Sequence, residues 1–347
     1  MKRSVDIRDV ARKAGVSVGT VSRVVNGHPS VTIAKRALVQ SAIAELRFRP
    51  DAFAQSLRKR TSNTIGVIIP DIRNPFFAEM MQCIEIEARG LGYSVLFVSS
   101  HEDPQADVDQ VEALAARKVD GILLLPSTGT TSATGVEGVP IVVVDRPIEG
   151  HPTVAADNRG GARLAAEYLL TLGHRRVAYI SGPRNSPTAK ARLDGFLDVM
   201  TPHYLAAGLS IDDYVISCEF DYIAGQRAAD ALLGGTNPPP TAIFAGSDQQ
   251  AIGVLRAAAD RGIAVPRDLS VLGFDGILLS DVVTPRLTTI VQPVARIAEA
   301  AVAMLLDANL SDGARAPLLL ECALAIRDSC APAPRVSERR SVLRRKA

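Results

Sequence analysis

Residues 7–26, IRDVARKAGVSVGTVSRVVN, predict two short helices joined by a tight turn. Asp6 stands where a helix N-cap acceptor is expected, and Gly15 can end the first helix because glycine enters the left-handed region without a steric cost. Ser17 can then cap the second helix. Apolar side chains of the first helix recur at i, i+3, i+4 and i+7, the period of one helix face: Ile7, Val10, Ala11 and Ala14.

The second helix of this pair is predicted to have an apolar face and a polar face. Val21, Val24 and Val25 fall on the apolar face. The opposite face is small, polar and basic, so no bulky side chain keeps it out of a DNA major groove. A plain helical hairpin is the alternative interpretation. The candidate DNA-contacting residues of this region are Ser17, Val18, Gly19, Thr20, Ser22, Arg23 and Asn26.

Charge is unevenly distributed along the 347 residues, although the formal net charge is only +2. Residues 1–63 hold 13 Lys and Arg against four Asp and Glu, a net charge of +9, and residues 331–347 carry +5. Residues 64–330 carry −12. A solvated basic surface is the ordinary explanation of such a bias, but a basic head that contains the helix pair is also what a binder of the DNA phosphate backbone requires.

The helix pair closely resembles the head of the lactose-repressor (LacI/GalR) family of bacterial transcription regulators. The resemblance implies a ligand-responsive, sequence-specific DNA-binding protein, most often a repressor, that binds a pseudo-palindromic operator as a homodimer. It rests on Asp9-Val10-Ala11, Ala14-Gly15-Val16-Ser17, Thr20-Val21-Ser22-Arg23-Val24 and Asn26.

A third helix and a short fourth one are predicted before the core. Thr32 is expected to cap the third helix, whose apolar residues again have the helical period. After Pro50, residues 51–58 would form a helix of about two turns, which is too short to be stable alone in water. The family resemblance implies that this is a hinge helix that orders on DNA and inserts a leucine into the minor groove. Leu57 matches that leucine, and Ala54 is a second candidate contact.

From Thr64 onward, short β-branched runs alternate with helical stretches, as in TIGVII (64–69), GILLL (121–125) and IVVV (141–144). Such alternation predicts an α/β fold with parallel sheets. The family's core resembles periplasmic sugar-binding proteins, which implies two lobes joined by three crossing segments, expected near 157–161, 290–293 and 316–322. The predicted divisions are a helix-turn-helix head (1–50), a hinge helix and linker (51–63), a two-lobed effector-binding and dimerisation core (64–330) and a basic tail (331–347), which we expect to be disordered.

Polar residues follow several of the predicted strands: Asp71, Asp145-Arg146, Asp157-Asn158, Ser247-Asp248 and Asp275. Ligands of open α/β sheets bind outside the carboxyl ends of the strands, so these residues could hold a hydroxyl-rich small molecule, although an aspartate there can simply cap a helix. The family resemblance places an effector pocket, for a sugar or a purine-like metabolite, at Phe76, Phe77, Thr188, Arg192, Phe220, Asp248 and Asp275.

The sequence departs from the family pattern at a few positions. Asp51 replaces an Asn, and Lys35 replaces a Thr. Arg47-Phe48 stands where the family has Gly-Tyr. Near the pocket, Ser247 replaces an Asn and Gly276 replaces an acidic or amide residue, so we expect the hydrogen bonds to the effector to differ in detail.

An enzyme on a two-lobed α/β core, with an incidental helical head, is the competing function. The only catalytic pattern, G-x-S-x-G at residues 15–19, lies between two helices rather than after a strand. We therefore expect no catalytic residue, no metal site and no cofactor, and the scattered cysteines indicate no disulfide framework. No secretory signal or membrane span is evident, so we expect a cytoplasmic, nucleoid-associated protein. The regulator is favoured, because an enzyme needs neither a basic head nor a hinge helix.

Overall fold

The computed structural model describes residues 5–25, 28–48, 61–131, 138–235, 237–307 and 316–334. The chain divides into two compact units, Met1–Asn63 and Thr64–Ala347. Asn26, the predicted hinge helix with Ala54 and Leu57, and the tail beyond residue 334 lie outside the described residues.

The first unit contains a helical head of α1 (Ile7–Ala14), α2 (Val18–Val25) and α3 (Ile33–Leu46). Asp6 caps α1 as predicted, and its capping box is completed by the Asp9 carboxylate, which accepts the Asp6 N–H at 3.1 Å. Gly15 ends α1 in the left-handed conformation, with φ 64°. One small core holds the three helices together and includes Val10, Val21, Val24, Val39 and Ala42.

Both ends of the third helix differ from standard helix caps. Thr32 is the N-cap residue of α3 as predicted, but its side chain makes no capping hydrogen bond, so its hydroxyl does not have the predicted role. The C-cap residue is Arg47, at φ 47°, in a left-handed conformation that normally favours glycine.

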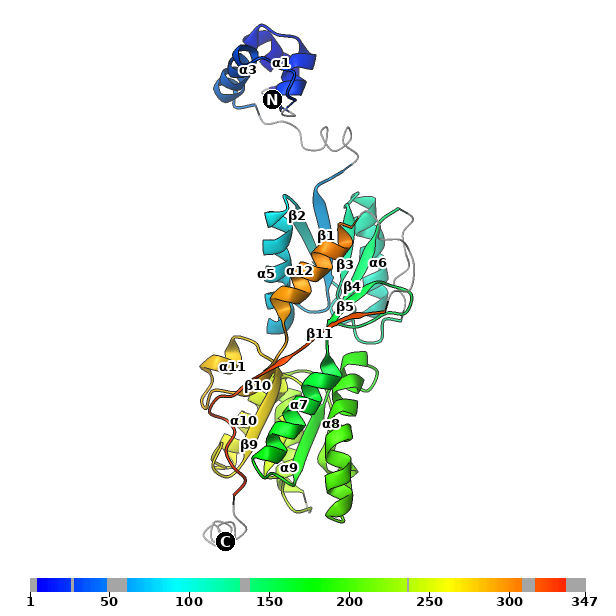
Figure 1. The fold of residues 1–347 in the computed structure, drawn as a ribbon, viewed down its shortest axis with the longest axis vertical. Helices are drawn as coiled ribbons and strands as arrows, with labels where there is room; N and C mark the ends of the chain where they lie inside the picture. Colours follow the sequence, from blue (N-terminus) through cyan, green and yellow to red (C-terminus); the bar gives the residue numbers. More distant parts are fainter. Residues whose placement is uncertain are drawn as a thin grey trace. The chain divides into compact units, whose positions relative to one another are not determined.

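The second unit contains two six-stranded sheets, one in each of two lobes (Figure 1). The sheet of the first lobe is parallel throughout, in the order β11-β5-β4-β3-β1-β2. One of its faces packs against α5 and α12, and the other packs against α6. Its elements are β1 (Thr64–Ile69), α5 (Pro75–Gly90), β2 (Ser94–Ser99), α6 (Pro104–Ala116), β3 (Gly121–Leu124), β4 (Ile141–Val144), β5 (Thr153–Ala156), α12 (Val294–Leu305) and β11 (Leu318–Leu320).

The second lobe repeats this design in the order β12-β10-β9-β8-β6-β7. Its elements are α7 (Asn158–Thr171), β6 (Val177–Ser181), α8 (Pro187–Ala206), the 3-10 turn η1 (Ile211–Tyr214), β7 (Val215–Ser217), α9 (Tyr222–Gly234), β8 (Ala242–Ala245), α10 (Asp248–Asp260), β9 (Ser270–Asp275), α11 (Leu279–Val282), β10 (Thr288–Val291) and β12 (Ala323–Ala325). The prediction of parallel sheets holds except at β12, which pairs antiparallel with β10 at the edge.

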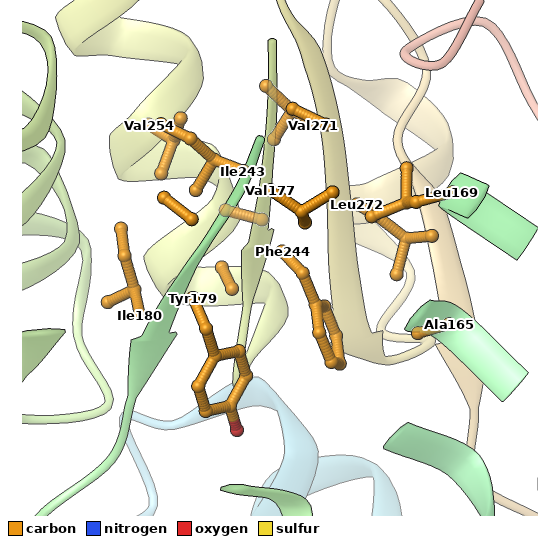
Figure 2. Packing of buried hydrophobic residues seen from close by; sticks show 14 of the residues in the cluster. Ala165, Leu169, Val177, Tyr179, Ile180, Ile243, Phe244, Val254, Val271 and Leu272 are labelled. Carbon is orange, nitrogen blue, oxygen red and sulfur yellow. The ribbon is translucent and has the colours of Figure 1, made fainter. Parts of the chain in front are cut away.

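Alternate residues of the second sheet face opposite layers of helices. Figure 2 shows Leu169 of α7 on the side of Leu272, and Val254 of α10 on the side of Ile243. Tyr179 stacks on Phe196 of α8 with ring centroids 4.8 Å apart. This alternation is the period of a strand buried on both faces.

The chain crosses between the lobes three times. It leaves the first sheet after β5 to form α7, returns after β10 to form α12, and passes from β11 directly to β12. These crossings coincide with the three predicted segments. Neither lobe is therefore a continuous piece of sequence, and the residues at the crossings lie where lobe motions would be concentrated.

Candidate functional site

The head presents the predicted DNA-contacting residues on one side of α2. Ser17, Val18, Gly19 and Arg23 are exposed, while Val21 and Val24 are buried against the other helices. Thr20 and Ser22 are half-buried. The Thr20 N–H donates to Ser17 Oγ at 3.2 Å, so Ser17 caps α2 as predicted. The six described candidates thus start at the N-terminal end of one helix, where the backbone N–H groups favour phosphate.

A cavity of about 950 Å³ lies between the two lobes. From the first lobe it is lined by Asp71, Arg73, Asn74, Glu102, Thr128 and Arg146. From the second lobe it is lined by Pro183, Asn185, Glu219, Phe220, Asp221, Tyr222, Ile223, Ala224, Arg227 and Gln249. Its volume is within the range of small-molecule sites, roughly 300–1,000 Å³. Of the seven predicted effector residues, Phe220 is part of this lining.

Arg192 and Asp275 form a buried pair in the second lobe. Arg192 Nη1 lies 3.2 Å from Asp275 Oδ1, and Arg192 Nε donates to Asn158 Oδ1 at 2.7 Å. The guanidinium lies 3.9 Å from the centre of the Phe274 ring and 5.6 Å from that of Phe220. The structure therefore brings Arg192, Asp275 and Phe220 together, and their role in holding an effector stays a prediction.

The carboxylate of Asp248 binds other groups of the protein and does not face the cavity. One of its carboxylate oxygens accepts the N–H groups of Gly276 and Ile277, both at 2.9 Å, and the other accepts the Thr289 hydroxyl. The side chain is fully buried and does not line the cavity. Asp248 therefore fixes the turn that follows Asp275, because its carboxylate is already bound within the protein.

The remaining predicted residues are buried beside the cavity rather than in its lining. Phe76 and Phe77 pack edge to face, with ring centroids 5.3 Å apart, in the core of the first lobe. The Arg146 guanidinium lies 5.5 Å from the centre of the Phe77 ring. Thr188, in the first turn of α8, shares a 2.9 Å hydrogen bond with the Ser186 hydroxyl.

Three buried aspartates lie in this region: Asp145 and Asp275 at the ends of β4 and β9, and Asp248 at the start of α10. Burial raises the pKa of Asp275 to about 6, and the opposing effect of Arg192 is smaller. Burial also raises the pKa of Asp145, against the attraction of Arg146 and Arg192, and that of Asp248, where the Asp275 charge adds to the effect. Asp145 and Asp275 both have positive φ, 73° and 118°. Strained backbone and buried charge together are typical of binding sites.

Four buried polar atoms near the cavity have no hydrogen-bond partner among the described residues. They are Asp145 Oδ1 and Arg146 Nε of the first lobe, and Gln249 Nε2 and Gln292 Oε1 of the second. Gln292 also donates to Asp275 Oδ1 at 2.8 Å. The sequence singled out Asp145 and Arg146 only as residues after a strand, and it did not point to either glutamine. Gln292 directly follows β10, so its position after a strand was a usable signal.

The described part of the chain contains no cluster of side chains suited to hold a metal ion. Among the same residues, no helix is both long enough and apolar enough to cross a membrane.

A helix-turn-helix head followed by a two-lobed binding core defines a class of protein: a transcription regulator that responds to a ligand. Residues 6–51 match the family model of bacterial regulatory proteins, lacI family, and residues 166–330 match the periplasmic binding protein-like domain. The chain belongs to the lacI family of bacterial regulatory proteins.

Individual relatives resemble nearly the whole chain. The ribose operon repressor of Halalkalibacterium halodurans is 39% identical over 289 residues, which cover 83% of this chain and 85% of that protein. The HTH-type transcriptional repressor CytR of Escherichia coli is 36% identical over 338 residues, covering 94% of this chain and 97% of that protein. The crystal structure of the lac repressor dimer bound to operator and the anti-inducer ONPF has a TM-score of 0.83 at 28% identity, covering 95% of this chain and all of that one.

Proposed function

We propose that the protein is a homodimeric repressor, not an enzyme, that binds a pseudo-palindromic operator and holds a sugar or related metabolite between its lobes. In this proposal residues 1–50 read the operator, residues 51–63 form the hinge helix and linker, residues 64–330 bind the effector and dimerise, and residues 331–347 are a basic tail. It acts in the cytoplasm, at the nucleoid. The names of the relatives support this assignment, since they are a ribose operon repressor and a repressor dimer on its operator.

The effector class follows from the four unpartnered atoms. Asp145 Oδ1 and Gln292 Oε1 are acceptors, whereas Arg146 Nε and Gln249 Nε2 are donors. A hydroxyl group both donates and accepts, so a molecule with several hydroxyls can satisfy this mixed set. Each buried polar group left without a partner costs about 1–3 kcal/mol, so a matching ligand regains that free energy on binding. Phe220 supplies an apolar ring face in the same cavity.

The response to the effector follows from the two-lobed design. The unpartnered atoms come from both lobes, so the effector binds the arrangement that brings all four around it more tightly than any other. Three crossing segments can transmit the resulting rotation within the core. Whether the effector induces or corepresses then depends on which arrangement lets the hinge helices pair on DNA.

A direct test combines ligand screening with operator binding. Full-length protein is screened against pentoses, hexoses and nucleosides by thermal shift, and operator affinity is measured by fluorescence anisotropy on the promoter nearest its own gene. We expect at least one hydroxyl-rich compound to raise the melting temperature and to change operator affinity more than tenfold. Asp145→Asn should lower the affinity for that compound more than tenfold and leave ligand-free operator affinity unchanged.

Glu112→Gln is the matched control, because it makes the same chemical change at an exposed position on α6. It should behave like the parent. Normal effector affinity in Asp145→Asn, or no response to any hydroxyl-rich compound, would refute the assignment of the effector site.

A further inference from the structure

The loop after β2 has an unusual backbone. His101 and Glu102, two consecutive residues with side chains, both adopt the left-handed conformation, with φ 56° and 58°. The loop is fixed in place by the Glu102 N–H, which donates to Pro70 O at 3.1 Å, and by the His101 N–H, which donates to Ser99 Oγ at 3.4 Å. Backbone in this region persists only where surrounding contacts impose it, and such residues cluster at functional sites.

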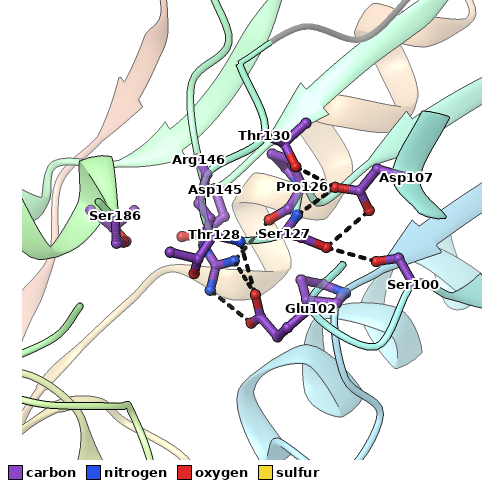
Figure 3. A network of polar contacts seen from close by, with 12 residues as sticks. Ser100, Glu102, Asp107, Pro126, Ser127, Thr128, Thr130, Asp145, Arg146 and Ser186 are labelled. Atoms are coloured by element: carbon purple, nitrogen blue, oxygen red, sulfur yellow. Dashed lines mark hydrogen bonds and ion pairs between the residues drawn. The ribbon is translucent and has the colours of Figure 1, made fainter. Parts of the chain in front are cut away.

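The loop conformation directs the Glu102 carboxylate toward Arg146, as Figure 3 shows. Glu102 Oε2 accepts Arg146 Nη1 at 3.1 Å and the Thr128 N–H at 2.8 Å, while Oε1 accepts Arg146 Nη2 at 3.3 Å. Arg146 Nη1 also donates to Pro126 O at 2.8 Å. The terminal nitrogens of Arg146 are therefore both engaged within the first lobe.

What remains of Arg146 for a ligand is its Nε–H, which is buried and has no hydrogen-bond partner among the described residues. It lies 3.8 Å from Asp145 Oδ2, and Asp145 Oδ1 is unpartnered as well. A donor and an acceptor thus stand side by side, which suits two neighbouring hydroxyl groups. We propose that Glu102 is a positioning residue that keeps the Arg146 guanidinium from closing its long ion pair with Asp145 into a two-bond pair, so that Asp145 Oδ1 and the Arg146 Nε–H stay open to the effector.

The geometry of Arg146 explains why a two-bond pair with Asp145 would form without Glu102. A guanidinium pairs most strongly with a carboxylate through two parallel N–H donors. With its terminal nitrogens free, Arg146 could rotate onto Asp145, which already lies within 4 Å, and close the site on itself. Glu102 also holds the Thr128 N–H in the cavity wall, next to Gly129, where an added Cβ would lie 3.3 Å from Asn185 Nδ2 of the other lobe.

The first test needs no ligand. Crystal structures of the full-length parent, Glu102→Ala, Glu102→Gln and the exposed control Glu112→Ala are compared at Arg146. We expect the guanidinium to form a two-bond pair with Asp145 in Glu102→Ala, and to stay in place in the control. In Glu102→Gln one side-chain oxygen remains to accept Arg146, so the parent position should be partly retained. An unmoved Arg146 in Glu102→Ala would overturn the proposal.

The second test uses D-ribose as the probe and rests on the proposed function. Calorimetry should show that sugar affinity falls tenfold or more for Glu102→Ala and for Arg146→Ala, with little further loss in the double variant. The reason is that Glu102→Ala diverts the Arg146 Nε–H to Asp145, and Arg146→Ala removes the same group. Additive losses would show that Glu102 contacts the sugar itself and would overturn the positioning role. If D-ribose fails to bind the parent, the sugar assignment loses support, while the crystallographic comparison still decides whether Glu102 positions Arg146.

Discussion

The backbone N–H of Leu278, in the second lobe, donates a 2.8 Å hydrogen bond to the carboxylate of Glu79, in the first lobe. The residue before it, Ile277, is buried in the hydrophobic core of the first lobe together with Phe76 and Phe77. The turn that follows Asp275, a predicted effector-site residue, therefore joins the two lobes. Only two residues of chain separate Asp275 from this contact between the lobes.

This bond predicts that Glu79→Ala shifts the core toward more open lobe arrangements. A hydrogen bond to a charged group contributes about 1.5–3 kcal/mol, and partial exposure of Glu79 reduces that figure, so we expect a shift of about tenfold in the lobe equilibrium. Pulsed electron paramagnetic resonance, with one spin label on each lobe, measures this shift as a longer mean distance between the two labels. Glu85→Ala, on the same helix, is the control; identical distance distributions in parent and Glu79→Ala would contradict this role.

The raised pKa of Asp275, about 6, predicts a pH-dependent stability. A carboxyl whose pKa is higher in the folded chain than the unfolded value of about 3.9 holds its proton more tightly when folded, so its ionisation destabilises the fold. The free energy of unfolding should therefore decrease as the pH rises from about 4 to about 6, by on the order of 3 kcal/mol from this group. Urea titrations between pH 4 and 7.5 should show a flatter profile for Asp275→Asn, and an unchanged profile would refute the assignment.

Arg47 predicts a stabilising substitution in the head. It ends α3 at φ 47°, where a side chain costs about 1 kcal/mol relative to glycine, so Arg47→Gly should raise the stability of the head by up to that amount. Gln40→Gly, at an exposed position within α3, should instead lower it by about 1 kcal/mol. Thermal unfolding followed by helical circular dichroism measures both. A loss of stability in Arg47→Gly would mean that its side chain makes a contact worth more than the backbone strain.

Arg23 is the exposed basic residue of α2, and it predicts a loss of sequence-specific binding. If its guanidinium reads a base, Arg23→Ala should weaken operator binding by about 1–3 kcal/mol and random DNA binding by much less. Fluorescence anisotropy on both DNAs, at one salt concentration, makes the comparison. Equal losses on the two DNAs would assign Arg23 to the phosphate backbone.

The fold was predictable where a strand carries a long β-branched run. The TIGVII and IVVV segments coincide with β1 and β4 at both ends. The strands β7, β11 and β12 have only three residues each, too few to display a period, and the pairing of β12 is decided by its neighbour β10 rather than by its own sequence. Thr32 has the residue type of a helix cap, yet its side-chain geometry depends on a rotamer that sequence does not determine.

The candidate site was predictable where residue type and family position mark a residue, but not where its role depends on contacts made by the fold. Arg192 and Asp275 stand out by residue type and by family position, and the structure brings them within 3.2 Å. The internal role of Asp248 depends on the backbone N–H groups of Gly276 and Ile277, which no sequence pattern displays. Glu102 and Arg146 lie 44 residues apart, and they meet only because two loops converge at the same edge of the sheet.

The crossing segments also govern how the protein is made. The first five strands of the first lobe leave the ribosome early, but α12, which covers one face of their sheet, is synthesised about 140 residues later. At 5–20 residues per second this delay is roughly 7–30 s. During that time the surface that α12 later covers, which includes Val142 and Val154, is open to chaperones and to neighbouring chains, while most of the second lobe can already be folding. Completion of the first lobe is therefore among the last events of biosynthesis.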